Sequence, residues 1–501
     1  MYFFTILFYV LVVSFCALSI CYAEHRWKRR RWYLCSKNVP GPKSFPFIGA
    51  AYILLIDPND LLKVITDKID SYRDILKFWM GNKLLYCLMN PKYIEKVINS
   101  TKALDKDCFY EPFAQMTGEG LVTLGGAKWK RHRKVITPSF NQRVLDSFVV
   151  LFNEKGVDLV KKLEKHVGQR NVPVYSILGK MILELACQTS MGVELDVESL
   201  ERRLDEVLDK QIHLFTEKTL ILWNHFEVIW YLSGKKKMYQ DYINRFGSII
   251  SEVIKKKIKD EKPNEQKKLG ILNNYGDIPE KHAFLDTLIE NTDLDENEIR
   301  DEVNTFILAA TETTTNALAA ILTMLGIYRD VQEEVYKEII DVVGVEGEVM
   351  PQDLIRMELT ERVIKETLRL FPAGPVMSRY VSGDIDIGDN IIIPEGVSVA
   401  VPLLYIHRNG EIYEDPLKFD PDRFLPENVA KRPPSTYFGF SQGPRSCIGS
   451  KYAMMNMKVI LAHAIRRLKF FSEYKSVADI ELKMTMLLRM KHGPKVWVEK
   501  R

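Results

Sequence analysis

The sequence contains few cysteines, and none of them lies in a spacing typical of a metal site or a disulfide framework. The seven cysteines stand at positions 16, 21, 35, 87, 108, 187 and 447, with no Cys-x-x-Cys pair and no zinc-type spacing. Their odd number leaves at least one thiol without a disulfide partner in the chain. We therefore expect free thiols and a reducing compartment.

The chain also lacks a strong excess of charge of either sign. Its formal net charge is +4 over 501 residues, which is too small to indicate electrostatic binding of nucleic acid, so no nucleic-acid partner is expected. We find no internal repeat and no low-complexity tract. With 46% apolar and 27% charged residues, the chain is expected to form one large globular domain or two closely associated lobes.

The first 23 residues contain no charged side chain. A helix of this length, rising about 1.5 Å per residue, crosses a hydrocarbon core of roughly 30 Å. A cleavable signal peptide is the alternative, because residues 21–23 could pass as a cleavage site, but the basic segment that precedes such peptides is missing. Basic residues follow the apolar run instead, at Arg26, Lys28, Arg29, Arg30 and Arg31. We therefore predict a single-pass anchor with the bulk of the chain in the cytosol.

The segment after the anchor is rich in residues that prevent helix formation. Residues 39–49, VPGPKSFPFIG, contain three prolines and two glycines, which stiffen the exit from the membrane. We therefore predict a transmembrane helix at 1–23, a basic and proline-rich hinge at 24–49, and a globular domain at 50–501.

The pattern within the predicted domain is mostly helical, with a minor β portion. Helical periodicity dominates from residue 128 to about 370. A charged segment at 255–279 interrupts it and predicts a surface connection. Alternating runs predict strands at 75–90, 384–402 and 494–499, the first of them a hairpin that turns at Gly81 and Asn82.

One cysteine stands in a glycine- and proline-rich loop, FGFSQGPRSCIGS, directly before an apolar-periodic run. We expect a helix to begin near Gly449, and its positive end would lower the pKa of the Cys447 thiol. Gly443 and Gly449 allow close approach of a flat group, Arg445 can pair with an acidic group, and Phe440 can shield the sulfur. A structural cysteine beside an ordinary helix cap is the alternative.

The complete pattern of this loop, Phe-x-x-Gly-x-Arg-x-Cys-x-Gly, closely resembles the haem-binding loop of the cytochrome P450 superfamily. The resemblance extends over essentially the whole chain. It implies the P450 fold, a triangular α-helical domain with a small β-rich region, and makes residues 50–501 the catalytic haem-thiolate domain. It also implies haem b, with the Cys447 thiolate as the axial ligand of the iron.

A long apolar helix is predicted from the segment VNTFILAATETTTNALAAILTM. Helical spacing places Phe306, Ala310, Thr313 and Ala317 on one face. The Thr313 hydroxyl can donate a hydrogen bond to the carbonyl of Ala309, four residues earlier, which loosens the backbone and makes room for a small molecule. A helix whose polar residues are satisfied by its own backbone is the alternative.

The run AATETT within this helix resembles the oxygen-activation motif of the P450 superfamily. The resemblance implies that Glu312 and Thr313 relay protons to dioxygen, and that Ala310 replaces the usual glycine beside the haem. The longer stretch EVNTFILAATETT is similar to family four, membrane-bound fatty-acid and xenobiotic hydroxylases of animals. Many of its members esterify a glutamate to the haem where this chain has Ala309, so we predict non-covalent haem and have no support for strict terminal-carbon selectivity.

Glu366 and Arg369 lie three residues apart on a predicted helix and would by themselves indicate a surface ion pair. Together with Arg423 they look like the buried Glu-Arg-Arg triad of the superfamily, which is a structural lock. The resemblance also assigns contacts with the haem propionates, to which a planar guanidinium is suited. Those contacts fall on Trp129, Arg133 and Arg379.

These features imply a monooxygenase of the endoplasmic reticulum membrane that inserts one atom of O2 into a fatty acid, another lipid or a xenobiotic. Electrons would come from NADPH through NADPH-cytochrome P450 reductase, with cytochrome b5 as a further candidate partner. A reductase-independent haem-thiolate isomerase or dehydratase, and a non-catalytic haem- or lipid-binding protein, are the alternatives. A basic face for the reductase is expected from Lys130, Arg131, Lys134, Lys451 and Lys458. Apolar pocket walls are expected at 109–124, 214–230, 306–310, 376–377 and 485–488.

Overall fold

The structure is a computed structural model that describes residues 2–192, 197–260, 283–290 and 293–501. The chain divides into two units. The first comprises Met1–Asp107 and Val376–Pro402, and the second comprises Cys108–Pro375 and Leu403–Arg501. The surface connection predicted at 255–279 lies for the most part outside the described residues.

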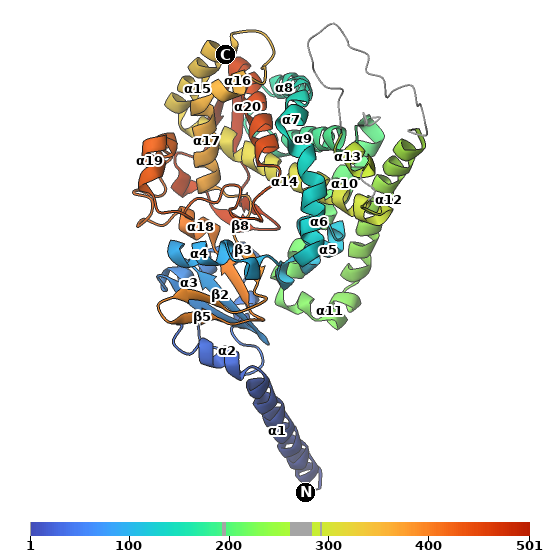
Figure 1. Ribbon diagram of the computed structural model, residues 1–501, viewed down its shortest axis with the longest axis vertical. Helices are drawn as coiled ribbons and strands as arrows, with labels where there is room; N and C mark the ends of the chain where they lie inside the picture. Colours follow the sequence, from blue (N-terminus) through green and yellow to red (C-terminus); the bar gives the residue numbers. More distant parts are fainter. Residues whose placement is uncertain (1, 193–196, 261–282, 291–292) are drawn as a thin grey trace. The chain divides into compact units, whose positions relative to one another are not determined.

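The first unit combines α-helices with a four-stranded sheet in the order β1-β2-β6-β3 (Figure 1). Its helices are α1 (Tyr2–Lys28), α2 (Arg30–Cys35), α3 (Pro58–Asp70) and α4 (Pro91–Ile98). Its strands are β1 (Ile75–Met80), β2 (Lys83–Leu88), β3 (Met377–Tyr380), β4 (Ile385–Gly388), β5 (Ile391–Ile393) and β6 (Ser398–Val401). Only the contact of β2 with β6 is parallel, and β4 and β5 form a separate antiparallel pair. The predicted hairpin and the strands predicted at 384–402 are thereby confirmed.

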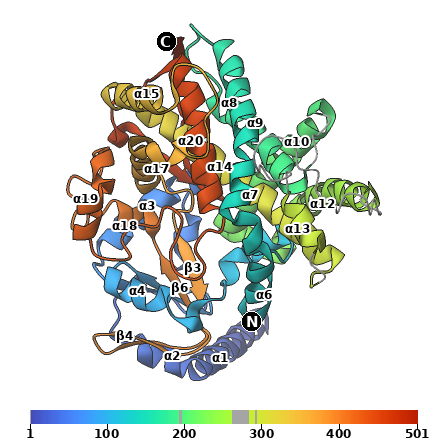
Figure 2. The same cartoon turned by 45° about the horizontal axis from the view of Figure 1, so that its top comes forward.

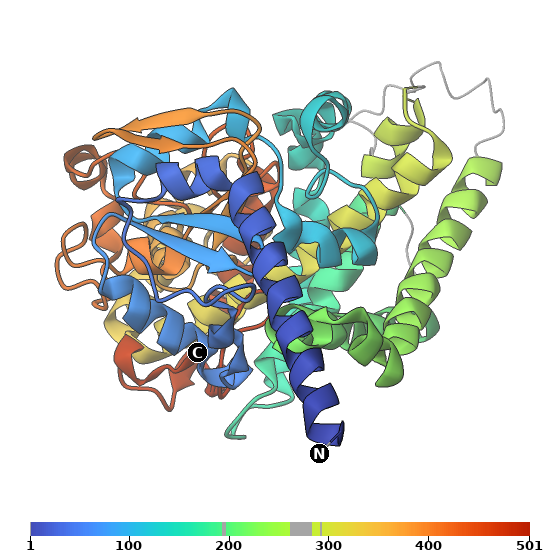
Figure 3. The same cartoon turned by 90° about the horizontal axis from the view of Figure 1, so that it is seen from below.

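Helix α1 is the candidate membrane anchor of the first unit. None of its residues is buried, and it extends away from the rest of that unit (Figure 1), so that it lies in front of other segments when seen from below (Figure 3). The helix continues past residue 23 to Lys28, because the residues after the apolar run also favour helix. Among the described residues, α14 (Glu296–Ile327) is the other helix apolar and long enough to cross a membrane, but most of it is buried in the core of the second unit.

Helix α2 attaches the basic segment after the anchor to the first unit. The Trp32 indole donates a hydrogen bond to the carbonyl of Glu395 (2.9 Å), and Arg31 forms an ion pair with Asp384. The Tyr33 ring stacks on Trp79, with 4.4 Å between the ring centroids. The hinge is therefore held by specific contacts and is not a loose tether.

The second unit is mostly helical. Its helices before the core helix α14 are α5 (Glu111–Thr117), α6 (Gly126–Ile136), α7 (Gln142–Ser147), α8 (Val149–Glu164), α9 (Val174–Met191), α10 (Val197–Leu220), α11 (Glu227–Leu232), α12 (Lys235–Asp260) and α13 (Phe284–Glu290). Those after it are α15 (Arg329–Val343), α16 (Asp353–Arg356), α17 (Glu358–Leu370), α18 (Leu403–His407), α19 (Pro426–Lys431) and α20 (Ser450–Arg467). Its strands are β7 (Leu468–Ser472), β8 (Leu482–Met484), β9 (Leu488–Met490) and β10 (Val496–Lys500), paired as β7 with β10 and β8 with β9.

Helix α14 organises the core of the second unit. Asp295 caps its first turn in a reciprocal box with Glu298, which satisfies free backbone N–H groups there. Its N-terminal half packs in one buried apolar cluster with α10 and α12, and its C-terminal half packs in another with α8, α9, α17 and α20. Helix α20 runs beside α8 (Figure 2). A helix buried on nearly all sides explains why its apolar residues are not confined to one stripe.

Candidate active site

The loop that carries Cys447 is shaped by its glycines and ends where α20 begins. Gly443 has a φ angle of +74°, a conformation that favours glycine, and Gly449 is the N-cap of α20, as predicted. The backbone N–H of Cys447 donates a hydrogen bond to the carbonyl of Phe440 (2.9 Å), which closes the loop. A Cβ added to Gly449 would lie 4.0 Å from the Cys447 sulfur. The Cys447 side chain remains exposed.

The electrostatic surroundings of Cys447 differ from the expectation. Burial by the surrounding protein raises the pKa of the Cys447 thiol above its ordinary value, although the side chain keeps an accessible surface. The backbone N–H of Gly449 and the charge of Arg133 act in the opposite direction and do not outweigh burial. The expected lowering of this pKa by the helix start alone is therefore wrong. A bound metal ion would deprotonate the thiol outright.

Two arginines, Arg133 on α6 and Arg445 within the loop itself, connect the cysteine loop to its surroundings. The Arg133 guanidinium donates a hydrogen bond to the carbonyl of Ser446 (3.2 Å), next to Cys447. The Arg445 guanidinium donates one to the carbonyl of Leu124 (2.7 Å) and lies 4.6 Å from the centre of the buried Trp129 ring. The structure thus brings together Cys447 with Arg445, Trp129 and Arg133, four of the predicted residues. Their charge suits an anionic ligand.

Helix α14 contains the predicted hydrogen bond from the Thr313 side chain to the helix backbone. The Thr313 hydroxyl donates to the carbonyl of Ala309 at 2.7 Å, which confirms the expectation. One turn before Ala309, the Phe306 ring packs against the ring of Tyr452 of α20, with 5.9 Å between the ring centroids. Ala310 is partly exposed, as is Thr313, although most of the helix is buried. The helix that starts at the cysteine loop and the helix that bears Thr313 are therefore in direct contact.

The side chain of Glu312 has partners that the sequence did not reveal. Its carboxylate accepts a hydrogen bond from the Arg489 guanidinium of β9 (2.6 Å) and another from the Tyr175 hydroxyl of α9 (3.3 Å). Arg489 and Tyr175 stand 177 and 137 residues away in the chain. No local pattern could have identified them, because the contact depends on how α9 and the β8–β9 hairpin pack on α14.

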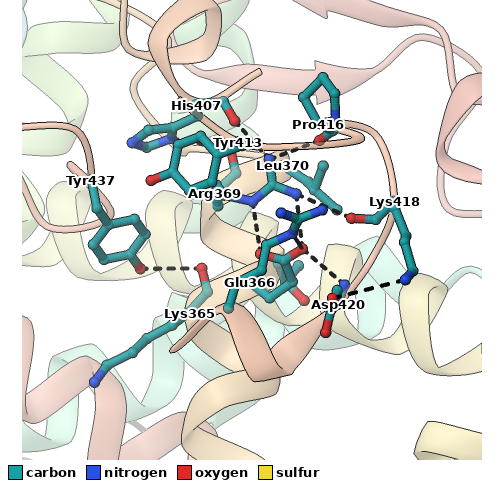
Figure 4. Close-up of polar contacts among 12 residues, drawn as sticks. Lys365, Glu366, Arg369, Leu370, His407, Tyr413, Pro416, Lys418, Asp420 and Tyr437 are labelled. Carbon is teal, nitrogen blue, oxygen red and sulfur yellow. Dashed lines mark hydrogen bonds and ion pairs between the residues drawn. The ribbon is translucent and has the colours of Figure 1, made fainter. Parts of the chain in front are cut away.

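The pair Glu366 and Arg369 forms a fully buried lock, as predicted (Figure 4). Arg369 binds both carboxylate oxygens of Glu366, at 2.7 and 2.8 Å, and the third member, Arg423, lies 3.6 Å from the same carboxylate. The remaining Arg369 N–H groups donate to the carbonyls of His407 (2.6 Å), Pro416 (2.8 Å) and Lys418 (3.2 Å). The triad therefore fastens α17 to the segment that leads to the cysteine loop.

His407 extends this lock to the cysteine loop itself. Its Nδ1–H donates to the carbonyl of Arg369 (3.0 Å), and its Nε2 accepts a hydrogen bond from the backbone N–H of Phe438 (2.8 Å). Burial, followed by the nearby charge of Arg369, lowers the pKa of His407 to about 3. A neutral ring with one donor and one acceptor is what both contacts require. The first residue of the loop is thus tied to the buried triad.

A buried ion pair joins α6 to α14. The ring of His132 lies 2.6 Å from the carboxylate of Glu302, and that carboxylate also accepts a hydrogen bond from the backbone N–H of Leu121 (3.0 Å). Burial alone would lower the pKa of His132, but its contacts with Glu302 and Glu298 outweigh burial and raise it. This pair positions the helix that carries Trp129 and Arg133, and the sequence analysis did not find it.

Comparison with known proteins identifies the family. The sequence profile of the cytochrome P450 family matches residues 39–498. The chain belongs to the cytochrome P450 family. It is 31% identical to cytochrome P450 4c21 of Blattella germanica, over 96% of both chains. It is also 31% identical to cytochrome P450 4c3 of Drosophila melanogaster (95% of this chain and 91% of that protein) and to cytochrome P450 4V2 of Homo sapiens (94% and 90%). The predicted resemblance to family four is confirmed.

The residues at the loop fit the haem of a cytochrome P450. Members of the family bind haem b through a cysteine thiolate, and the haem supplies the activation of dioxygen. Cys447 is an exposed residue, Arg133 bonds to the carbonyl of Ser446 next to it, and Arg445 lies over the Trp129 ring, so the two guanidinium groups are candidates to bind propionates. Cys447, Arg133, Arg445 and Trp129 would therefore hold the haem.

Two of the residues predicted to act in a cytochrome P450, Arg379 and Lys458, are not placed with these four residues. Arg379 is buried in β3 of the first unit, where its guanidinium donates to the carbonyl of Ser378 (2.8 Å), and its predicted contact with a propionate stays a prediction. Lys458 was expected on an exposed reductase-docking face, and this is wrong. It is buried in α20 and donates to Glu361 and to the carbonyl of Leu354, both at 2.7 Å. Of the other four, Arg131 forms an ion pair with Glu298, and Lys130, Lys134 and Lys451 are exposed.

Haem extraction tests the consequence of the alanine at position 309. A methyl group cannot form an ester, so acidified organic solvent is expected to remove intact haem and leave a polypeptide of the sequence mass, as mass spectrometry would measure. The matched variant Ala309→Glu supplies a carboxylate on the same face and is expected to yield a haem-bound fraction after turnover. A haem adduct that survives denaturation of the unmodified protein would contradict the expectation.

Proposed function

We propose that this cytochrome P450 is a membrane-bound monooxygenase of the endoplasmic reticulum that inserts one oxygen atom of O2 into a lipophilic substrate with electrons from NADPH. The observation that carries the proposal is the helix turn at residues 309–313. There the Thr313 hydroxyl donates a hydrogen bond to the Ala309 carbonyl, and the carboxylate of the neighbouring Glu312 pairs with the Arg489 guanidinium at 2.6 Å. An alcohol and a carboxylate side by side form a proton path.

Each residue has a distinct task in this proposal. Glu312 takes a proton from the solvent side of α14 and passes it on, and Thr313 holds the proton path at the reacting oxygen. Bound haem would supply the cleavage of O2 with two electrons from the reductase and two protons, one oxygen atom leaving as water. A break in the path to Thr313 would favour loss of the reduced oxygen as hydrogen peroxide. A reductase-independent isomerase needs no such path, so the retained pair favours the monooxygenase.

The apolar cluster around the N-terminal half of α14 supports a lipophilic substrate. Segments predicted as pocket walls contribute Leu214, Phe215 and Trp230 to this cluster, and all three are buried. Met486, in the turn between β8 and β9, packs against the same cluster. Fatty acids, other lipids and xenobiotics are the substrate classes that such walls suit. Residues 376–377 belong to the first unit.

The electron donor in this proposal is NADPH-cytochrome P450 reductase, with cytochrome b5 as a second candidate. Lys130 and Lys134 on α6 and Lys451 on α20 are exposed and lie on the two helices that flank Cys447. Exposed cations attract an acidic partner and raise the rate of encounter. The proposed docking surface therefore consists of these three exposed lysines and does not include the buried Lys458.

A coupling measurement on Thr313→Ala tests the proposed function. In a system reconstituted with reductase, the variant is expected to keep oxidising NADPH while product per NADPH falls several-fold and hydrogen peroxide rises, because the proton path is broken. Thr323→Ala is the matched control, since Thr323 makes the same bond to the carbonyl four residues earlier on the same helix (2.8 Å). Coupling in Thr313→Ala equal to that of the control would contradict the role of Thr313. Absence of NADPH-dependent product from the unmodified protein would contradict the function.

Truncation tests the attachment to the membrane, and a glycosylation sequence in the chain tests the orientation. Removal of about the first 25 residues is expected to release the protein only partly from membranes. Near the hinge, Phe47, Ile48 and Leu55 are exposed on the first unit, so truncation combined with Ile48→Asp and Leu55→Asp should release more. Asn99 begins the exposed acceptor sequence Asn-Ser-Thr and is expected to carry no glycan in the full chain. A glycan on Asn99 would place the domain in the lumen and contradict the cytosolic orientation.

A further inference from the structure

The carboxylate of Glu312 is held by residues from outside α14. Arg489 forms an ion pair with it at 2.6 Å, and the Tyr175 hydroxyl donates to the same oxygen at 3.3 Å. The Arg489 guanidinium also lies 4.7 Å from the centre of the Tyr175 ring. Burial, followed by the charge of Glu312, raises the pKa of Tyr175, so its hydroxyl stays protonated and able to donate. Glu312, Arg489 and Tyr175 thus form one mutually supported cluster.

The hairpin that supplies Arg489 is fixed to α14 at a second point. One turn after Glu312, the Asn316 side chain donates a hydrogen bond to the carbonyl of Leu488 (2.5 Å). Residues four apart lie on the same face of a helix, so consecutive turns of α14 bind consecutive residues of β9. The backbone N–H of Leu488 also donates to the carbonyl of Ala373 (2.9 Å). The position of Arg489 relative to Glu312 is therefore set by several contacts.

A cleft of about 230 Å³ lies directly beside the cluster. Its lining includes Tyr175, Asn316, Lys483, Arg489 and Lys491. Asp209 on α10 is a further charged group that acts on both Tyr175 and Arg489. Because Asn316 and Arg489 line the cleft, water that enters it can reach the residues that hold the hairpin and Glu312 together.

We infer that Arg489 is the positioning residue of Glu312 in proton delivery. This inference rests on the proposed relay through Glu312 and Thr313. Arg489 holds the Glu312 carboxylate in one orientation, so that this carboxylate accepts a proton from water of the cleft and then passes that proton toward Thr313. One proton enters and one leaves, and the carboxylate is restored to its ion pair. Tyr175 fixes the same carboxylate oxygen and keeps Arg489 in place.

Loss of Arg489 should change the pH dependence of coupling. A carboxylate without its cation is protonated more easily, so the acid limb of product formed per NADPH should move to higher pH. At neutral pH, coupling in Arg489→Gln is expected to fall several-fold and peroxide to rise. Arg489→Lys restores the positive charge and is expected to recover much of both. A residue that only stabilised the hairpin would lower the amount of folded protein without moving the pH profile.

The chain offers a closely matched control in Arg501. Its guanidinium pairs with Glu333 at 2.7 Å and lies 3.8 Å from the centre of the Tyr336 ring, the same two kinds of contact that Arg489 makes. Arg501→Gln therefore removes an equivalent interaction outside the site and is expected to leave the pH profile of coupling unchanged.

The experiment compares the holoenzyme variants Arg489→Gln, Arg489→Lys, Glu312→Gln, Arg501→Gln and the double variant of Glu312 and Arg489. Coupling is measured against pH, and thermal unfolding is measured for each protein. We expect the losses of coupling and of thermal stability from Arg489→Gln and Glu312→Gln to be non-additive, because both substitutions break the same ion pair. The inference would be overturned if Glu312→Gln lost coupling but Arg489→Gln had the same pH profile of coupling as Arg501→Gln. It would also be overturned if the losses from Arg489→Gln and Glu312→Gln were fully additive in the double variant. Unchanged coupling in Glu312→Gln itself would overturn the proposed relay and the inference with it.

Discussion

Arg369→Met is expected to lower the free energy of unfolding by about 3–5 kcal/mol and to leave little haem-loaded protein. The reason is the complete burial of both partners, since neither Glu366 nor Arg369 has any exposed side-chain surface. Methionine fills the volume but leaves the carboxylate of Glu366 with one weak cation contact, from Arg423 at 3.6 Å. It also removes the donors to the carbonyls of His407, Pro416 and Lys418, which burial then leaves without hydrogen bonds.

The same helix provides the control for this prediction. Lys365 pairs with Glu361 at 2.7 Å, and about a third of each side chain is exposed, so Lys365→Met is expected to cost less than about 1 kcal/mol. Chemical denaturation measures both values, and the haem content of the purified protein reports whether the loop is formed. Glu366→Gln added to Arg369→Met should recover part of the loss, because the stranded charge is removed. An Arg369→Met protein as stable as Lys365→Met would show that the triad does not support the fold.

Cys447→Ser is expected to reduce reductase-supported product formation to background. A serine hydroxyl is a weaker electron donor to iron than a thiolate, and it is that donation which favours cleavage of the O–O bond in this family. The substitution changes one atom and leaves the loop bond between the Cys447 N–H and the Phe440 carbonyl in place. The variant should therefore still fold and bind haem. Cys108→Ser removes another thiol of the second unit and should keep full turnover; equal turnover in the two variants would contradict the assignment.

The features that the sequence predicted well depend on short spacings. Glu366 and Arg369 are three residues apart on one helix, and Thr313 and Ala309 are four apart, so helix geometry alone places their atoms within hydrogen-bond reach. The glycines of the cysteine loop likewise follow from local backbone conformation. Beyond these, the resemblance to the P450 superfamily supplied the identity of the ligand and the fold.

The features that the sequence did not predict depend on contacts between distant segments. His132 meets Glu302, and Arg489 meets Glu312, only because separate helices and a hairpin pack on α14. Lys458 follows a helical pattern that is equally compatible with an exposed and a buried position, and packing of α16 and α17 decided it. The pKa of Cys447 was misjudged because the helix start is local, whereas burial is a property of the whole unit.

The absorption spectrum of the ferrous carbonyl complex is the most direct test of the central claim that Cys447 is the axial ligand. The unmodified holoenzyme is expected to show a Soret band strongly shifted to the red of that of a histidine-ligated haem, and Cys108→Ser should show the same band. Cys447→Ser, with haem still bound, is expected to lose the shifted band. A Cys447→Ser protein that retained it would show that another residue ligates the iron.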